Sequence, residues 1–253
     1  MHSSGRGCQV RLRAMTRAAS RGVTEPETLE QHGERARLAS WRADGQVAHL
    51  SPTAMRPLSA AFIDSCLERL RARGFTIVVT SALSAEESAG FLKAGFDVQE
   101  ELELLSHDLE RIPGVSHRLH RPWRGERRRV LAVDAIAFDA FWRLHKGGLD
   151  DALGATPSVR FRVHGRGDRL DAYVIGGRGS GTGYVQRLAV HPSARGQGLG
   201  RSLVGDVLRW MQRRGAARAL VNTQQTNEAA RALYRSCGFQ VLPEGLQVLA
   251  RPL

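Results

Sequence analysis

The fold of this chain is decided by the stretch Leu188-Ala-Val-His-Pro-Ser-Ala-Arg-Gly-Gln-Gly-Leu-Gly200. It joins a candidate strand at residues 184–190 to a candidate helix whose apolar residues recur every three or four positions. Glycine carries no Cβ atom, so the backbone amides of this loop can turn inward and approach a ligand closely. The helix that follows points its positive N-terminal end into the loop, and such an arrangement binds a pyrophosphate group.

Two other nucleotide-binding loops do not fit this stretch. The Rossmann fingerprint needs glycines at its first, third and sixth positions, but the sixth position counted from Gly196 is Arg201. A P-loop needs Gly-Lys-Ser or Gly-Lys-Thr, and neither tripeptide occurs in the chain.

Two further segments accompany the glycine loop. Leu188-Ala-Val-His-Pro192 precedes it, and Asn227-Glu-Ala-Ala-Arg-Ala-Leu-Tyr-Arg-Ser-Cys-Gly-Phe239 follows it. Together with the pattern Arg195-x-x-Gly198-x-Gly200, they resemble the acetyl-CoA motif of the GNAT (GCN5-related) N-acetyltransferase superfamily over about a quarter of the chain. The resemblance implies an α/β (α+β) fold with a mixed, splayed β-sheet flanked by helices.

The implied reaction is the transfer of an acetyl group from acetyl-CoA to a primary amine by direct attack, without a metal. The acceptor is either a protein N-terminus or lysine, as in ribosomal-protein acetyltransferases, or a small amine. The sequence does not distinguish these acceptors. The alternative is a non-catalytic module that binds acetyl-CoA, nucleic acid or a partner protein.

The resemblance also implies roles for individual residues. The pantetheine arm of the cofactor would pair with backbone groups of the preceding strand, the loop amides would hold the pyrophosphate, and Asn227 would reach the cofactor arm. Tyr234 would protonate or hydrogen-bond the departing thiolate, and its ordinary pKa near 10 suits a donor. Seven residues separate Asn227 from Tyr234, so a helix would present both on one face. The implied cofactor-binding residues are Leu188, Val190, Arg195, Gly196, Gln197, Gly198, Gly200, Arg201 and Asn227.

The general base stays open at this point. Many GNAT enzymes place a glutamate on the strand that corresponds to residues 184–190, but this strand carries no carboxylate. Three alternatives remain for the deprotonation of the amine. They are a water held by Gln186 or by a backbone carbonyl, a carboxylate from elsewhere such as Asp134 or Asp139, and no protein base at all.

The two halves of the chain share a weak internal repeat. Its three pairs of similar segments are 45–50 with 183–188, 67–74 with 208–215, and 91–96 with 234–239. The offset grows from 138 to 141 residues between the first two pairs, so the first copy lacks three residues where the second carries its glycines. We therefore predict a disordered basic extension at 1–30, a degenerate GNAT-like domain without a cofactor loop at 31–113, and the catalytic domain at 114–253. This tandem architecture is similar to that of mycothiol synthase.

Periodicity and turn signals predict the secondary structure. We expect helices at 59–74, 84–95, 130–141, 199–215 and 227–237. We expect strands at 37–41, 47–50, 75–80, 158–163, 170–175, 184–190 and 219–223, one or two more after Phe239, and the first strand of the second domain within 111–129.

Composition limits the partners. The net charge is +12, but nearly all cationic residues are arginines in a chain that is also rich in alanine, so codon bias explains the charge and nucleic acid is not expected as a partner. A basic surface also attracts the polyanionic coenzyme A. The three cysteines lack the spacing of metal ligands, so we expect no metal site. No long apolar run or signal sequence occurs, so we expect no membrane contact and a cytoplasmic location. The oligomeric state is not predicted.

Overall fold

The computed structural model describes residues 25–41, 45–53 and 56–253. We call the part up to residue 113 the first half and residues 114–253 the second half. The first half contains β1 (Glu27–Gln31), β2 (Glu34–Ser40), β3 (Val47–Pro52), α1 (Ala60–Ala72), β4 (Ile77–Thr80), α2 (Ala85–Lys93) and β5 (Asp97–His107). The second half contains α3 (Arg127–Ala137), α4 (Lys146–Gly154), β6 (Ser158–His164), β7 (Ala172–Gly179), β8 (Thr182–Val190), α5 (Leu199–Arg213), β9 (Arg218–Gln224), α6 (Glu228–Ser236), β10 (Gln240–Val241) and β11 (Leu246–Pro252).

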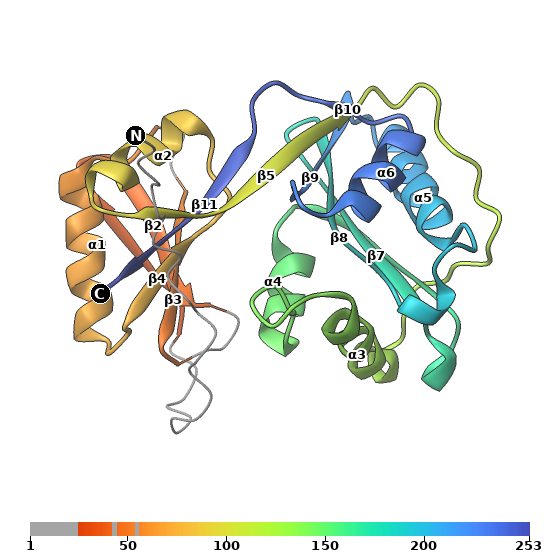
Figure 1. Ribbon diagram of the computed structural model, residues 1–253, viewed down its shortest axis with the longest axis horizontal. Helices are drawn as coiled ribbons and strands as arrows, with labels where there is room; N and C mark the ends of the chain where they lie inside the picture. The colour runs from red at the N-terminus through yellow and green to blue at the C-terminus, as the bar shows by residue number, and fades with distance from the viewer. Residues whose placement is uncertain (1–24, 42–44, 54–55) are drawn as a thin grey trace, which may run out of the picture.

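One mixed sheet runs through both halves in the order β1-β2-β3-β4-β11-β5-β9-β8-β7-β6, and β10 also pairs with β5. Figure 1 shows that the long strands β5 and β11 cross between the two lobes of the molecule. Residues 97–102 of β5 pair with β11, whereas residues 102–107 pair with β9. β11 in turn pairs with β4, so the last strand of the chain completes the sheet of the first half. Each half therefore borrows a strand from the other.

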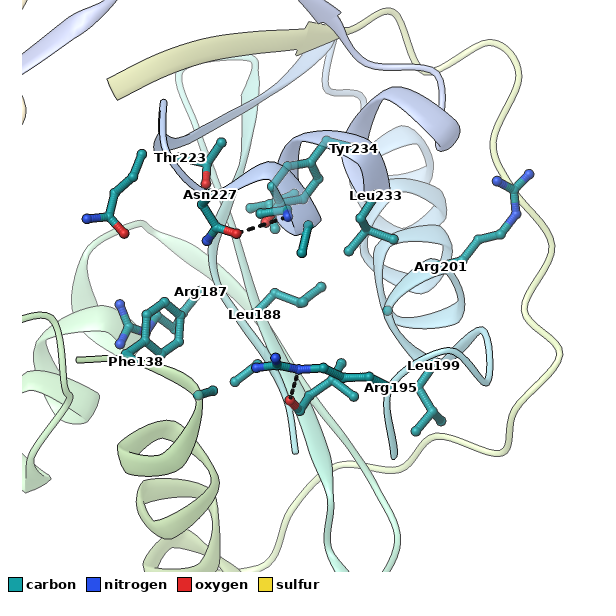
Figure 2. A pocket seen from close by; sticks show the side chains of 18 of the residues that line it. Phe138, Arg187, Leu188, Arg195, Leu199, Arg201, Thr223, Asn227, Leu233 and Tyr234 are labelled. Carbon is teal, nitrogen blue, oxygen red and sulfur yellow. Dashed lines mark hydrogen bonds between the residues drawn. The ribbon is translucent and has the colours of Figure 1, made fainter. Parts of the chain in front are cut away.

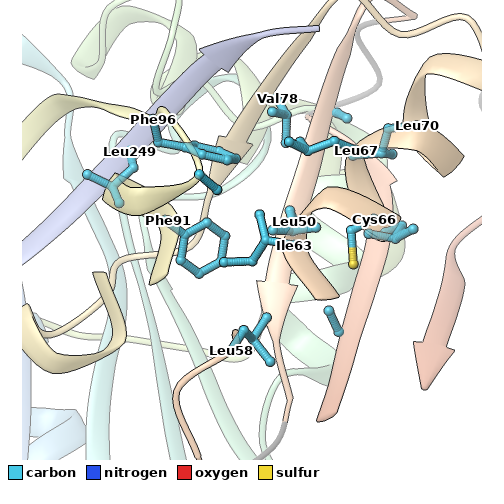
Figure 3. Close-up of a cluster of buried hydrophobic side chains, with 14 of the residues drawn as sticks. Leu50, Leu58, Ile63, Cys66, Leu67, Leu70, Val78, Phe91, Phe96 and Leu249 are labelled. Carbon is cyan, nitrogen blue, oxygen red and sulfur yellow. The ribbon is translucent and has the colours of Figure 1, made fainter. Parts of the chain in front are cut away.

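The helices of the first half begin and end where the sequence predicts. The Ser59 side chain accepts a hydrogen bond from the Phe62 amide at the start of α1, and Ser84 forms a capping box with Glu87 at the start of α2. The apolar face of α1 packs on β3 and β4, as Figure 3 shows. Its buried residues are Phe62, Ile63, Cys66, Leu67 and Leu70.

The sheet of the second half is covered on both faces. Ala172 and Val174 of β7 pack against α5, whereas Tyr173 and Ile175 pack against α3 and α4. Because successive side chains of a strand point to opposite faces, this double burial explains the unbroken apolar run of β7. Gly183 of β8 lets α5 lie close to the sheet, since a Cβ atom there would come within 2.5 Å of the Met211 sulfur.

Two predictions about the first residues of each half are wrong. β1 includes residues 27–30, which we predicted to be part of a disordered extension; residues 1–24 lie outside the described residues. β1 is a polar edge strand whose order comes from pairing with β2 and from the packing of Leu29 on the core. Residues 111–129 contain no strand but one isolated bridge, between His120 and Val163. Prolines have no amide to donate, and this segment carries two of them.

Other elements differ from the predicted pattern. α3 ends at Ala137 and not at Phe141, while α4 and β5 were not predicted. The run Glu100-Glu-Leu-Glu-Leu-Leu105 of β5 has no clear strand alternation and contains three carboxylates, so its strand state depends on neighbours on both sides. Within the described part of the chain, no helix is long and apolar enough to cross a membrane.

Candidate active site

A cavity of about 710 Å³ opens where β8 and β9 separate. The two parallel strands pair only between Thr182–Tyr184 and Arg218–Leu220. Beyond Tyr184 they diverge, and residues 185–190 of β8 line one side of the cavity while residues 222–224 of β9 line the other. The splayed sheet implied by the family resemblance is therefore present, and it creates the cavity.

The glycine loop closes one end of this cavity. Gly196 and Gly198 adopt left-handed backbone conformations, with φ of +77° and +80°. Gly198 is the N-cap of α5 and provides no side-chain cap, in contrast to the N-cap residues Ser59 and Asn227. The first amides of α5 therefore have no side-chain acceptor at the cap and can bind an anion.

All but one of the predicted cofactor-binding residues line the cavity. Gln197 is the exception. Arg195 and Arg201 are exposed and lie on either side of the loop: Arg195 Nε donates to the Val190 carbonyl at 3.4 Å, and Arg201 donates to the Ser236 carbonyl at 2.6 Å. Figure 2 shows Arg195 beneath the cavity and Arg201 directed away from it. Arg195 therefore adds a cation beside the uncapped helix end, whereas Arg201 lies in the first turn of α5 and contacts the end of α6.

One edge of β8 borders the cavity. Residues 182–190 of β8 pair with β7 on one side, but on the other side β9 has diverged after Tyr184. The backbone at Leu188 and Val190 therefore faces the cavity instead of a neighbouring strand. An extended ligand with amide groups can pair with such an edge in the manner of an added strand.

Tyr234 and Asn227 approach the cavity from α6, opposite β8 (Figure 2). The Tyr234 side chain is 6% exposed, and its ring lies 5.6 Å from that of Phe239. Burial raises the pKa of the Tyr234 hydroxyl well above its ordinary value. Asn227 does not lie within the helix as predicted: it is the N-cap, and its Oδ1 accepts from the Ala230 amide at 3.1 Å.

A buried ion pair supports the wall of the cavity, and the sequence did not reveal it. Asp134 of α3 is fully buried and accepts hydrogen bonds from Arg187 Nε at 2.8 Å and Arg187 Nη2 at 3.0 Å. It also accepts from the Tyr173 hydroxyl and from the Leu144 amide. The Arg187 guanidinium lies 3.5 Å from the centre of the Phe138 ring. Burial raises the pKa of Tyr173 well above its ordinary value, so this hydroxyl remains a donor.

Neither carboxylate suggested as a base lines the cavity. The oxygens of Asp134 are occupied by four donors, and Asp139 Oδ1 accepts from the Trp142 amide at 3.1 Å. Among the described residues that line the cavity there is no aspartate, glutamate or histidine. The polar side chains that line its central part are Gln186, Arg187, Asn222, Thr223 and Gln224.

Comparison with known proteins agrees with this geometry. Residues 152–239 match the model of the Acetyltransferase (GNAT) family. This region belongs to the GNAT acetyltransferases. The chain is 29% identical over 210 residues to mycothiol acetyltransferase of Amycolatopsis mediterranei, covering 67% of this chain and 68% of that protein. It is 36% identical over 85 residues to mycothiol acetyltransferase of Beutenbergia cavernae, covering 33% of this chain and 29% of that protein.

Solved structures share the fold of this chain at low identity. A tandem GNAT protein from the clavulanic acid biosynthesis pathway matches with a TM-score of 0.62 and 14% identity, covering 87% of this chain and 78% of that one. A GCN5-related N-acetyltransferase from Kribbella flavida matches with a TM-score of 0.61 and 14% identity, covering 90% of both chains. The family match and the relatives identify the protein as an acyltransferase.

We predict that Asp134→Asn destabilises this acetyltransferase. The asparagine still accepts hydrogen bonds, but the largely buried Arg187 loses its countercharge, so the free energy of unfolding should fall by about 2 kcal/mol. Urea denaturation followed by circular dichroism measures the change. Asp139→Asn is the matched control because that side chain is exposed, and it should change the stability by less than about 0.5 kcal/mol. Equal stability of the two variants would contradict the assigned role of the ion pair.

Proposed function

We propose that the second half transfers the acetyl group of acetyl-CoA to a primary amine by direct attack, without a covalent enzyme intermediate. The observation that carries this proposal is one cavity that joins three features. They are the uncapped start of α5 after Gly198, the unpaired edge of β8 at Leu188 and Val190, and the buried hydroxyl of Tyr234. These features fit the pyrophosphate, the amide-bearing arm and the thioester end of the cofactor.

Each end of the cavity then has a distinct task. The amides from Gly196 to Arg201 hold the pyrophosphate, with Arg195 adding positive charge. Asn227 reaches the cofactor arm from the start of α6. Acetyl-CoA supplies, when bound, an activated acyl group. The amine nitrogen forms the new C–N bond, the C–S bond breaks, and Tyr234 gives its proton to the departing sulfur.

The cavity favours an amine that is already neutral. Its described lining has no carboxylate to deprotonate an ammonium group, and the Asp134 carboxylate behind that lining is already bound by Arg187. An α-amino group with a pKa of about 7.8 is roughly one-third neutral near pH 7.5, whereas a lysine side chain near 10.4 is about one-thousandth neutral. Water bound beside Gln186, which lines the cavity, can take the proton that leaves during attack. We therefore propose an α-amino acceptor.

The acceptor class predicts a pH-dependent preference. At pH 7.5, kcat/KM for alaninamide should exceed that for Nα-acetyl-lysinamide by roughly a hundredfold, and the ratio should shrink as the pH rises toward 10. The thiol released from acetyl-CoA measures turnover. Amines related to mycothiol belong in the same panel, because two relatives are named mycothiol acetyltransferases. A preference for the lysine side chain at pH 7.5 would contradict the α-amino proposal, and the absence of both acetyl-CoA binding and turnover would contradict the function itself.

We further propose that residues 31–113 are a degenerate GNAT-like copy and residues 114–253 the catalytic copy. The order β3-α1-β4-α2-β5 repeats as β8-α5-β9-α6-β10, and in both halves the first two strands are parallel. The start of α1, however, is already occupied by a carboxylate: Glu34 accepts from both the amide and the hydroxyl of Ser59. Calorimetry should therefore show one acetyl-CoA per chain, and a stoichiometry of two would contradict the proposal.

A further inference from the structure

The exchanged strand β5 contacts the helix that carries Tyr234. Strand alternation directs Glu103 and Leu105 to the face covered by α5 and α6, and Leu105 packs in the same cluster as Tyr234. Glu103 lies opposite Thr223, a residue of β9 that lines the cavity. A strand of the first half thus places a carboxylate beneath α6.

Glu103 binds α6 at two arginines. Its Oε2 accepts from Arg231 Nε at 3.1 Å, and its Oε1 accepts from Arg231 Nη2 at 3.1 Å, so the pair is bidentate. Its Oε1 also accepts from Arg235 at 3.3 Å. Arg231 in turn donates to the Gln225 carbonyl at 3.2 Å, which connects the loop before α6 to the same network. The Glu103 side chain is only 13% exposed, and the Arg231 hydrogen bond holds the pKa of its carboxyl below the usual value.

α6 is a short helix that packs on the core through Ala230, Leu233 and Tyr234, and Glu103 adds the contact that joins it to β5. It has nine residues, and Tyr234 is the one among them that is buried. A helix of this length is not stable alone in water, so its position depends on contacts with its surroundings. Arg231 lies between Asn227 and Tyr234, and both of these line the cavity. A movement of α6 would displace Tyr234 from the cavity lining.

We propose that Glu103 is a positioning residue that holds α6 so that Tyr234 can donate its proton. Through this contact, a strand of the first half raises the catalytic rate of the second half, although we propose that the first half itself binds no cofactor. The inference rests on the proposed role of Tyr234. It predicts a larger effect on the chemical step than on the binding of acetyl-CoA, because the glycine loop lies on α5 and Asn227 is the one proposed cofactor contact at the start of α6.

The test compares Glu103→Gln with Glu101→Gln, a matched control at an exposed glutamate two residues earlier on the same strand. Glu103→Gln should lower kcat about tenfold, leave the calorimetric Kd for acetyl-CoA within about twofold, and speed amide hydrogen exchange in residues 228–236. Glu101→Gln should change none of these. Arg231→Gln should match Glu103→Gln, and the double variant should be no worse than either single variant.

A background variant separates positioning from general stability. In Tyr234→Phe, the Glu103→Gln substitution should have no further effect on kcat, since the group that it positions is gone. An additive loss there, or unchanged exchange in residues 228–236, would overturn the proposal. The hydrogen-exchange measurement needs no turnover, so it tests whether Glu103 holds α6 even if the wild-type protein is inactive. Inactivity of the wild-type protein would instead count against the proposed function.

Discussion

Tyr234→Phe should lower kcat about a thousandfold at neutral pH, because the departing thiolate then loses its proton donor. The ring remains, and so does its packing on Phe239, so the Kd for acetyl-CoA should stay within about threefold of wild type. Steady-state thiol release and calorimetry measure the two quantities. Tyr184→Phe is the matched control, since that tyrosine is partly exposed and lies outside the cavity lining.

The pH profile of the wild-type enzyme provides a second check on Tyr234. Burial raises the pKa of this hydroxyl, so it stays protonated beyond the ordinary tyrosine value of about 10. kcat should therefore show no loss from tyrosine ionisation up to that pH. Activity above one-tenth of wild type in Tyr234→Phe would assign the protonation of the thiolate to another group or to water.

Gly198→Val should weaken acetyl-CoA binding at least a hundredfold. Gly198 has φ of +80°, and a β-branched residue is strongly disfavoured there, so the loop must change its backbone and redirect the amides at the start of α5. The cause is the backbone angle and not space, because a Cβ atom at this position would meet nothing closer than 3.7 Å. Calorimetric titration with acetyl-CoA measures the effect.

The matched control for this prediction is Gly181→Val. Gly181 has φ of +75°, has open space around it and lies in the turn before β8, outside the cavity lining. The Gly181→Val variant should lose about as much folding stability as Gly198→Val, but it should bind acetyl-CoA with wild-type affinity. Equal affinities of the two variants would show that the glycine loop does not hold the pyrophosphate.

Much of the proposed cofactor end was predictable because its determinants are local. The backbone of Gly196 and Gly198 follows from short-range chemistry, as do the caps at Ser59 and Ser84 in the first half. The role of Asn227 was only partly predicted. The predicted shared face assumed that both Asn227 and Tyr234 lie within one helix. Asn227 instead caps α6, because its side chain accepts a hydrogen bond from the Ala230 amide.

The acceptor end was not predictable in the same way. The sequence left Asp134 open as one candidate base, and only the packing of α3 against β7 and β8 brings it to Arg187 and Tyr173. The pair spans 53 residues, so no local pattern records it. Glu103 is a similar case, because its partner Arg231 is 128 residues away on an element of the other half.

The sequence by itself determined most of the elements and the residues of the proposed donor site: the caps of α1 and α2, the glycine loop before α5, and the family that the second half resembles. Those features depend on residues within one or two turns of each other, where propensity and capping act. Three features were decided by the tertiary structure alone. They are the pairing of β5 and β11 with strands of the other half, the hydrogen bonds that occupy Asp134, and the contact of Glu103 with α6. These depend on pairing between distant segments, and for strands such as β5 that pairing outweighs what the local sequence favours.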